Sequence, residues 1–291
     1  MRCGILNVNK PTGETSRHVV DTVHRLVRPA KAGHAGTLDP LAAGVLLVAV
    51  GPATRLIKYL QRMPKQYKGT FLLGRESTTE DITGEVVELD DPPVPSMEKI
   101  AATAEKLLGR VEQRPPAFSA LKVAGKRAYD LARKGKPVDL KPRPVEIYGI
   151  EIIEYEYPKL TLDIRCGSGT YVRSLGRDLA ESLGTAAVMS SLVRTAIGDF
   201  HIDAATDPAS ISEENLETRL HPPLAAVEML PRVQLTVDLA ARVRNGQTIA
   251  AEMPESKTGE AAAVDPAGRF VAVLTPREPG WLRPQLVMRD A

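Results

Sequence analysis

One short segment of the 291-residue chain places an acid in a loop with little conformational freedom. It covers residues 33–44 and reads GHAGTLDPLAAG, with Asp39 directly before Pro40. A residue that precedes proline is pushed into extended backbone, so Asp39 cannot lie inside a helix. Leu38 and Leu41 flank the Asp-Pro pair and indicate packing on both sides. We therefore interpret Asp39 as a positioned nucleophile or base, against the alternative of an ordinary Asp-Pro turn beside a histidine.

An arginine and two tyrosines form the second group of candidates. Arg173 follows the glycine-containing turn at 167–171 and enters at the start of an expected helix. A buried carboxylate needs a cation to stay ionised and a half-buried guanidinium needs a carboxylate, so pairing Asp39 with Arg173 would satisfy both. Tyr67 and Tyr171 lie beside cations or glycine turns in a chain with few aromatics, and are candidates for stacking on nucleobases. The alternatives are a surface arginine and two ordinary half-buried tyrosines.

Other familiar site patterns are missing from the sequence, which has no phosphate-binding P-loop, no GxGxxG and no GxSxG turn. The two cysteines and five histidines show no metal-ligand spacing, and we interpret Cys166 as a core thiol. The longest clean apolar run, 41–50, is about half as long as a membrane-spanning helix needs to be, and no export signal is visible. We therefore expect a reduced, metal-free protein of the cytoplasm.

Charge is arranged in blocks, although the formal net charge is only +2. Residues 1–75 hold twelve Lys/Arg against three Asp/Glu, and residues 110–144 hold ten against three. Residues 76–100 hold one basic and eight acidic residues, and residues 199–230 hold one and seven. The two basic blocks could line one surface for a polyanion. The alternative is that all four blocks are ordinary solvated faces.

Hydrophobic periodicity and turn residues predict the elements that must position these candidates. In the first part we expect strands at 4–9, 45–50, 66–73 and 84–89, a helix capped by Ser16 and ending near Val27, and a helix that Pro52 opens and that ends near Met63. Further along we expect helices at 96–108 and 171–183 and strands at 145–155, 159–166 and 188–197. Helices and strands alternate irregularly and include hairpins, so the pattern predicts an α+β fold.

Two regions differ from the rest of the chain in composition and in the elements that we expect. Residues 114–144 are basic, rich in proline and broken by glycines, with a short helix expected near 127–134, and we interpret them as an arm. Short strands separated by Gly/Pro turns are expected at 233–237, 261–265, 269–274 and 285–288. The length of the chain predicts about two domains. We place a large domain at residues 1–230 and a small β-rich domain at residues 231–291.

A series of segments, taken in order along the chain, resembles the motifs of bacterial tRNA pseudouridine-55 synthases, the TruB family. The matching segments are 9–16 (NKPTGETS), 33–44, 65–68 (KQYK), 78–84 (TTEDITG), 115–122 (PPAFSALK), 125–129 (GKRAY), 142–145 (PRPV), 169–173 (GTYVR) and 192–194 (LVR). One such motif would be weak, but their succession in family order makes the resemblance specific. It extends over about residues 4–200.

The resemblance implies roles for the candidate residues. Asp39 matches the catalytic aspartate, the nucleophile that starts uridine isomerisation, and Arg173 matches its ion-pair partner. Tyr67 matches the aromatic residue that stacks on the flipped base and assists proton removal at C5.

Five further positions also match the family. His34, Tyr171 and Leu192 match positions that contact the bound nucleotides. Asp81 matches a carboxylate that can share Arg173 behind the site, and Lys10 matches a residue packed near it.

The same resemblance implies an overall fold and activity. The expected fold is a mixed, mostly antiparallel sheet flanked by helices, as in pseudouridine synthases, with a small PUA-like C-terminal domain. The expected reaction isomerises uridine 55 in the T-loop of tRNA, with no metal or organic cofactor, in a monomer that needs no guide RNA and no membrane. Two alternatives remain open: a non-catalytic RNA-binding module, and a relative that works only inside a guide-RNA complex.

Overall fold

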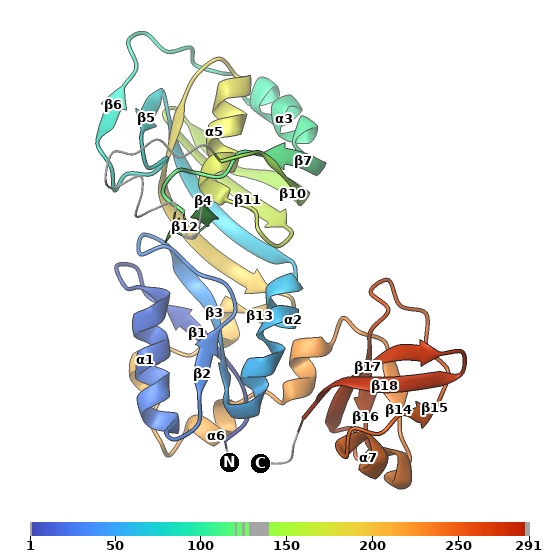
Figure 1. The fold of residues 1–291 in the computed structure, drawn as a ribbon. Helices are drawn as coiled ribbons and strands as arrows, with labels where there is room; N and C mark the ends of the chain where they lie inside the picture. Colours follow the sequence, from blue (N-terminus) through green and yellow to red (C-terminus); the bar gives the residue numbers. More distant parts are fainter. Residues whose placement is uncertain (1, 120, 124–125, 128–139, 289–291) are drawn as a thin grey trace. The chain divides into compact units, whose positions relative to one another are not determined.

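The computed structural model describes residues 2–119, 121–123, 126–127 and 140–288 (Figure 1). The short helix expected near 127–134 therefore lies outside the described residues, apart from Arg127. The chain forms two compact units, each with its own elements. The first unit comprises Met1–Pro40, Val45–Met63 and Asp203–Ala291, and the second comprises Leu41–Gly44 and Pro64–Ile202.

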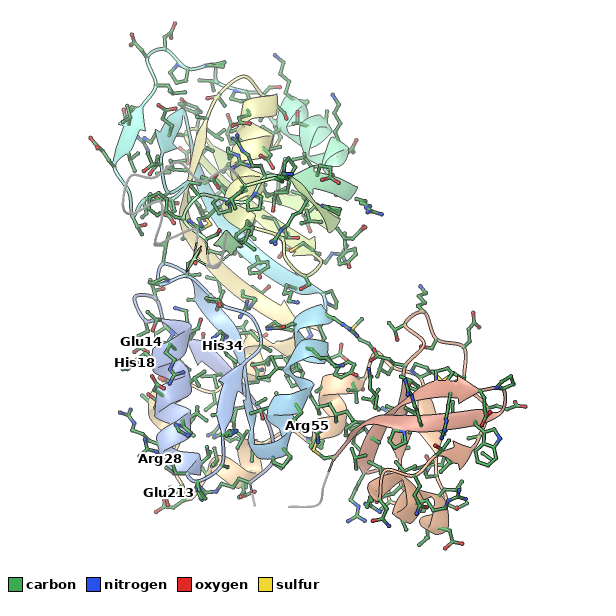
Figure 2. All side chains as sticks on the ribbon, in the orientation of Figure 1. Glu14, His18, Arg28, His34, Arg55 and Glu213 are labelled. Atoms are coloured by element: carbon green, nitrogen blue, oxygen red, sulfur yellow. The ribbon has the colours of Figure 1, made fainter. Side chains whose placement is uncertain are left out.

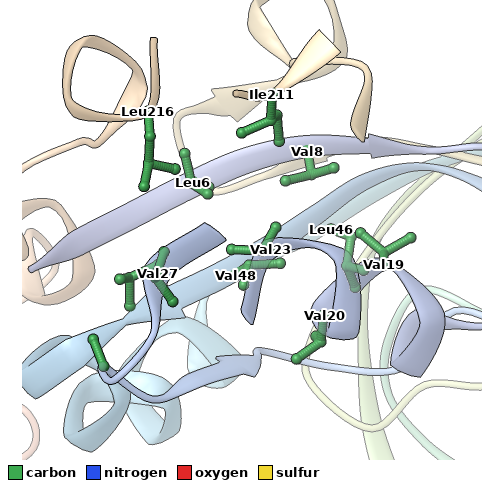
Figure 3. Packing of buried hydrophobic residues seen from close by; sticks show 12 residues of the cluster. Leu6, Val8, Val19, Val20, Val23, Val27, Leu46, Val48, Ile211 and Leu216 are labelled. Carbon is green, nitrogen blue, oxygen red and sulfur yellow. The ribbon is translucent and has the colours of Figure 1, made fainter. Parts of the chain in front are cut away.

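The N-terminal part of the first unit is built on a valine-rich helix against strands. It contains β1 (Gly4–Lys10), α1 (Ser16–Val27), β2 (Ala32–His34) and most of β3 (Ala43–Val50). Figure 3 shows the valines of α1 facing Leu6 and Val8 of β1 and Leu46 and Val48 of β3. These side chains are shielded from water, which is the main favourable contribution to folding. The expected helix at 16–27 and strand at 4–9 are confirmed.

The C-terminal part of the first unit is a five-stranded sheet with one helix. The strand order is β14 (Arg232–Gln234), β16 (Ala261–Val264), β17 (Phe270–Glu278), β18 (Trp281–Val287) and β15 (Ile249–Ala250), and the helix is α7 (Val237–Arg244). Short elements connect this part to the rest of the unit: η2 (Ile202–Ala204), η3 (Pro208–Ser210), α6 (Leu216–Arg219) and η4 (Pro223–Val227). The prediction of a β-rich C-terminal region is confirmed.

The second unit is a mostly antiparallel sheet. The strand order is β12 (Ala187–Ile197), β4 (Lys65–Leu73), β11 (Lys159–Cys166), β10 (Arg143–Glu156) and β7 (Gly109–Gln113), with β13 (Phe200–His201) paired to β12. The first residues of β3, Ala43 and Gly44, pair in parallel with Val193 and Arg194. A side chain at Gly44 would meet the backbone of Arg194 at 2.2 Å, so this pairing requires glycine.

Helices and hairpins complete the second unit. They are α3 (Met97–Lys106), α5 (Val172–Ser182), the hairpin of β5 (Arg75–Ser77) with β6 (Val86–Glu88), and the hairpin of β8 (Lys122–Val123) with β9 (Lys126–Arg127). A mixed, mostly antiparallel sheet with helices confirms the predicted fold class. Within the described part of the chain, no helix is long and apolar enough to cross a membrane.

Some element boundaries differ from the sequence-based expectations. Thr15, and not Ser16, caps α1, because its hydroxyl accepts the His18 N–H at 3.1 Å. The helix expected from Pro52 is a 3₁₀ turn, η1 (Gly51–Leu56), followed by α2 (Ile57–Arg62). The strand expected at 233–237 ends at Gln234, because Thr236 caps a helix instead. The short strands β2, β5 and β7 were not expected.

Candidate active site

Asp39 lies in the loop between β2 and β3, and its backbone is held on both sides. The preceding residue, Leu38, is buried, and its peptide groups bond to the hydroxyl of Ser16 at 2.9 and 3.0 Å. The carbonyl of the following residue, Pro40, accepts the N–H of Gly13 at 2.7 Å. Asp39 itself is half-buried. The structure therefore places Asp39 in a loop whose backbone is fixed on both flanks, and its role as a nucleophile stays a prediction.

Lys10 supports the turn from which these contacts come. It is fully buried at the end of β1, and its ammonium donates to the carbonyls of Pro11 at 2.8 Å and Glu14 at 2.7 Å. These two bonds close the turn that contains Gly13, whose φ of +89° suits glycine. The lysine is thus a buried cation that stabilises the turn beside the Asp39 loop.

His34 ends β2, opposite Val48 of β3 (Figure 2). It is half-buried, and the backbone N–H of Ala35 directly after it donates to Leu47 at 2.9 Å. The glycine-rich segment before Asp39 was expected to be a loop, but its first residues form this short strand. Strand pairing holds the backbone of His34 five residues before the aspartate.

Arg173 and Asp81 meet as a buried ion pair in the second unit. The guanidinium Nη1 lies 3.3 Å from Oδ2 of Asp81 and also donates to the Thr79 carbonyl at 2.8 Å, while Nη2 donates to the Phe118 carbonyl at 3.1 Å. The other carboxylate oxygen accepts the backbone N–H of Thr83 at 2.9 Å. The contact that the resemblance implied between these two side chains is therefore present.

A second acid–arginine pair lies beside the first, and sequence reasoning missed it. Glu80 bonds to Arg177, one helical turn after Arg173 on α5, and to the hydroxyl of Ser174 at 2.7 Å. Glu80 has a positive φ of 60°, a conformation that non-glycine residues rarely adopt. Burial raises the pKa of its carboxyl against the lowering effect of Arg177. The adjacent acids 80 and 81 thus contact the same face of α5.

Tyr67 is buried in β4, with Ile164 and Arg194 as its neighbours on the adjoining strands. The guanidinium carbon of Arg194 lies 6.0 Å from the centre of the tyrosine ring, within the range of a cation–π contact. Leu192 pairs with Gly69 two residues further along β4 and is also buried. Arg194 is almost fully buried, which the sequence alone did not reveal.

Lys65, the first residue of β4, pairs directly with Cys166, the last residue of β11. Burial lowers the pKa of Lys65 to about 8, with a contribution from the nearby charge of Arg194. Burial also raises the pKa of Cys166 to about 11. A thiol with a raised pKa is a poor nucleophile, which agrees with its interpretation as a core residue.

Tyr171 immediately precedes α5 and is held at both its backbone groups by one side chain. The amide of Gln113 accepts its N–H at 2.8 Å and donates to its carbonyl at 3.1 Å. The guanidinium carbon of Arg143 lies 5.1 Å from the centre of its ring. Gln113 and Arg143 were not predicted, because their partners lie 58 and 28 residues away in the chain.

The candidate residues fall into two groups. The first unit holds Lys10, His34 and Asp39, and the second holds Tyr67, Asp81, Tyr171, Arg173 and Leu192. Arg173 pairs with Asp81 inside its own unit, and its predicted pairing with Asp39 joins residues of different units and stays a prediction. Across the described ranges, no three His, Cys, Asp or Glu side chains cluster so that they could hold a metal ion.

Two parts of the chain match models of known protein families. Residues 24–172 match the model of the TruB family pseudouridylate synthase N-terminal domain, and residues 230–289 match that of the tRNA pseudouridine synthase II C-terminal domain. The chain belongs to the TruB family. The family resemblance expected from the motifs, and with it the expectation of a TruB-family enzyme, is confirmed.

Relatives of this TruB-family chain match it along nearly its whole length. The tRNA pseudouridine synthase B of Dehalococcoides mccartyi strain 195 is 40% identical over 289 residues, which is 98% of this chain and 96% of the relative. The enzyme of the same name from Thermosipho melanesiensis is 42% identical over 243 residues, 84% of this chain and 79% of the relative.

Solved structures share the fold. A chain in a crystal structure of a Cbf5-Nop10-Gar1 complex superposes with a TM-score of 0.71 and 27% identity, covering 94% of this TruB-family chain and 78% of its own length. A chain of an H/ACA ribonucleoprotein bound to a substrate RNA gives a TM-score of 0.74 at 24% identity, covering 99% and 85%. At that identity the second match shows only the fold.

Proposed function

We propose that this TruB-family protein isomerises uridine 55 in the T-loop of tRNA to pseudouridine. The observation that carries the proposal is Asp39, an acid in the family's motif whose backbone is fixed on both sides. Relatives with the name tRNA pseudouridine synthase B match almost the full chain, which supports tRNA as the substrate. The domain division at 230 and 231, with a PUA-like domain after it, is part of the proposal.

The chemistry requires few groups. The C1′–N1 bond of uridine breaks, the uracil rotates, a C1′–C5 bond forms, and the proton at C5 leaves while N1 gains one. Atoms and electrons balance without an oxidant, a reductant or a second substrate. Asp39 acts as the nucleophile, and the proposed pairing with Arg173 keeps its carboxylate ionised.

The target base must leave its stack, which costs a few kcal/mol. Stacking on an aromatic side chain returns about 1–3 kcal/mol per base, so one tyrosine offsets much of that cost. We assign this stacking to Tyr67, which also assists proton removal at C5, and contacts to the bound nucleotides to His34, Tyr171 and Leu192. Arg194 beside Tyr67 supports the assignment, because a buried cation near the ring restricts where the ring can lie.

Affinity for tRNA comes from the basic segments. Backbone phosphates attract Lys and Arg whatever the base sequence, and RNA loops are then recognised by shape and by splayed bases. The basic residues of 114–144 are proposed to contact the T-arm, with Arg143 near Tyr171 at the described end of this segment. We propose that the protein does this as a monomer in the cytoplasm.

The sequence also left open a relative that works only inside a guide-RNA complex. The stand-alone reading predicts that the purified protein modifies unassisted tRNA. Failure on naked tRNA, with modification restored by a guide RNA, would instead favour the guided alternative.

Release of tritium from tRNA that is labelled at uridine C5 measures the reaction. Asp39→Asn should lower the release rate at least about 1,000-fold, because it removes the nucleophile. Asp90→Asn, at an exposed aspartate, is the matched control and should react at the normal rate. A tRNA with cytidine at position 55 should release no label from that position. Normal release by Asp39→Asn would contradict the assignment, and unchanged tRNA binding with no catalysis by the native chain would favour the binding module.

A further inference from the structure

We propose that Ser16 is a positioning residue for Asp39. This inference rests on the proposed function, because it concerns how the nucleophile is held. Ser16 was expected to cap the first helix, but Thr15 occupies that position. The hydroxyl of Ser16 therefore serves a purpose other than capping, and its partners show which one.

Ser16 makes two hydrogen bonds with a single residue, 22 positions away. Its hydroxyl accepts the N–H of Leu38 at 2.9 Å and donates to the carbonyl of Leu38 at 3.0 Å. The serine is 2% exposed and Leu38 is 3% exposed, so water does not compete for these groups. The carbonyl of Leu38 belongs to the peptide bond that leads into Asp39. The hydroxyl therefore fixes the orientation of the peptide group that joins Leu38 to Asp39.

A second contact fixes the backbone after the aspartate. Gly13 donates its N–H to the carbonyl of Pro40 at 2.7 Å, and the proline ring restricts the backbone of Asp39 to extended conformations. Both anchors come from residues 13–16, where the turn after β1 leads into the first residue of α1. Leu38, directly before Asp39, and Pro40, directly after it, are thus both tied to one short stretch of chain.

The alternative is that Ser16 only stabilises the start of α1. Alanine has a higher helix propensity than serine, and the capping bond comes from Thr15, so the helix itself has no need of this hydroxyl. What Ser16→Ala removes is the pair of bonds to Leu38, which leaves a buried N–H and carbonyl without these partners. The loop that carries Asp39 is then free to shift.

Small shifts matter at a nucleophile, since a displacement of about 1 Å can slow a reaction by about 100-fold. Ser16→Ala should therefore lower the single-turnover rate of tritium release about 10- to 100-fold. The Kd for tRNA should stay within about twofold, because the Ser16 side chain is buried and therefore not available to contact the RNA. If Ser16 had only a structural role, Ser16→Ala would lower the melting temperature but would not slow the single-turnover rate while leaving the Kd unchanged.

Thr15→Ala is the matched control. It removes the bond to the His18 N–H, weakens the same helix at the neighbouring residue, and leaves the contacts of Leu38 in place. Both variants are assayed well below their melting temperatures. Normal single-turnover rate in Thr15→Ala together with a slow rate in Ser16→Ala supports the proposal. Equal rates in the two variants, whether both are normal or both slow, would overturn it.

Hydrogen exchange at the Leu38 amide tests the contact without any activity measurement. In the native chain this amide should be protected, and Ser16→Ala should lose that protection while Thr15→Ala keeps it. Unchanged protection of this amide in Ser16→Ala would show directly that Ser16 does not hold Leu38 in place. If instead the native chain lacks activity, or Asp39→Asn retains it, the proposed function fails while the exchange result still decides whether Ser16 holds the loop.

Discussion

The guanidinium of Arg173 and the carboxylate of Asp81 are 3.3 Å apart, and the two side chains are only 6% and 5% exposed. Arg173 enters from the first turn of α5, and Asp81 from the loop after β5. Asp81 is itself held by the Thr83 N–H and by the hydroxyl of Thr79 at 2.8 Å. Each charge in this buried pair is stabilised by the other, because neither side chain can be solvated by water.

Asp81→Asn should therefore destabilise the protein by about 3–5 kcal/mol, since it removes the negative charge that lies against the buried Arg173 guanidinium. The measurement is urea unfolding of the native chain and the variant. The control is Glu154→Gln, which breaks the exposed pair with Lys159 and should not change stability measurably. A loss in Asp81→Asn no larger than in the control would show that the pair does not hold the start of α5.

Binding of tRNA should weaken steeply with salt, because each phosphate contact contributes about 0.7–0.9 to the slope of log K against log salt. Reversing two exposed charges of the basic segment, Arg114→Glu with Lys141→Glu, should lower that slope by about 1–2. Lys99→Glu on α3 lies outside the segment and is the matched control, with an unchanged slope expected. A titration series between low and moderate salt measures both. Equal slopes in all three proteins would disprove the role of the segment.

Asp265 should make the stability of the C-terminal sheet sensitive to acid. The backbone N–H of Arg269, and then the side chains of Arg269 and Arg244, hold the pKa of its carboxyl at about 2. The pKa is lower in the folded chain than the ordinary value of 3.8. The folded state therefore favours the ionised form. The stabilisation is present above about pH 4 and is lost as the pH falls towards 2.

Asp265→Asn should accordingly melt at a lower temperature than the native chain at pH 6, and the difference should shrink as the pH falls from 4 to 2. The fluorescence of Trp281 reports on this sheet, because the chain has one tryptophan and it lies on β18. Glu252→Gln, at an exposed acid of the same region, should show no such convergence. A difference that is independent of pH would mean that ionisation of Asp265 does not stabilise the sheet.

Local signals predicted most elements well. The helices at 16–27 and 96–108 and the long strands β4, β10, β11 and β12 follow from apolar periodicity, which reflects one buried face. The same sequence signals predicted short elements less well, because only a few residues decide whether such an element forms. Val237 looked like the end of a strand, yet Thr236 caps a helix there, because a cap bond competes with strand pairing over a single turn. Short strands such as β2 form only because a partner strand lies beside them.

The amino-acid sequence by itself determined the family, the α+β class and the identity of the acid in its Asp-Pro loop, because these depend on residue types and on spacings along one stretch of chain. Tertiary structure alone decided that Ser16 bonds to Leu38, that Gln113 holds the backbone of Tyr171, and that Arg194 lies buried beside Tyr67. Those contacts join residues that are 22 to 127 positions apart. Burial removes water as a competing partner, so such distant polar groups must find each other, and only the folded chain determines which ones meet.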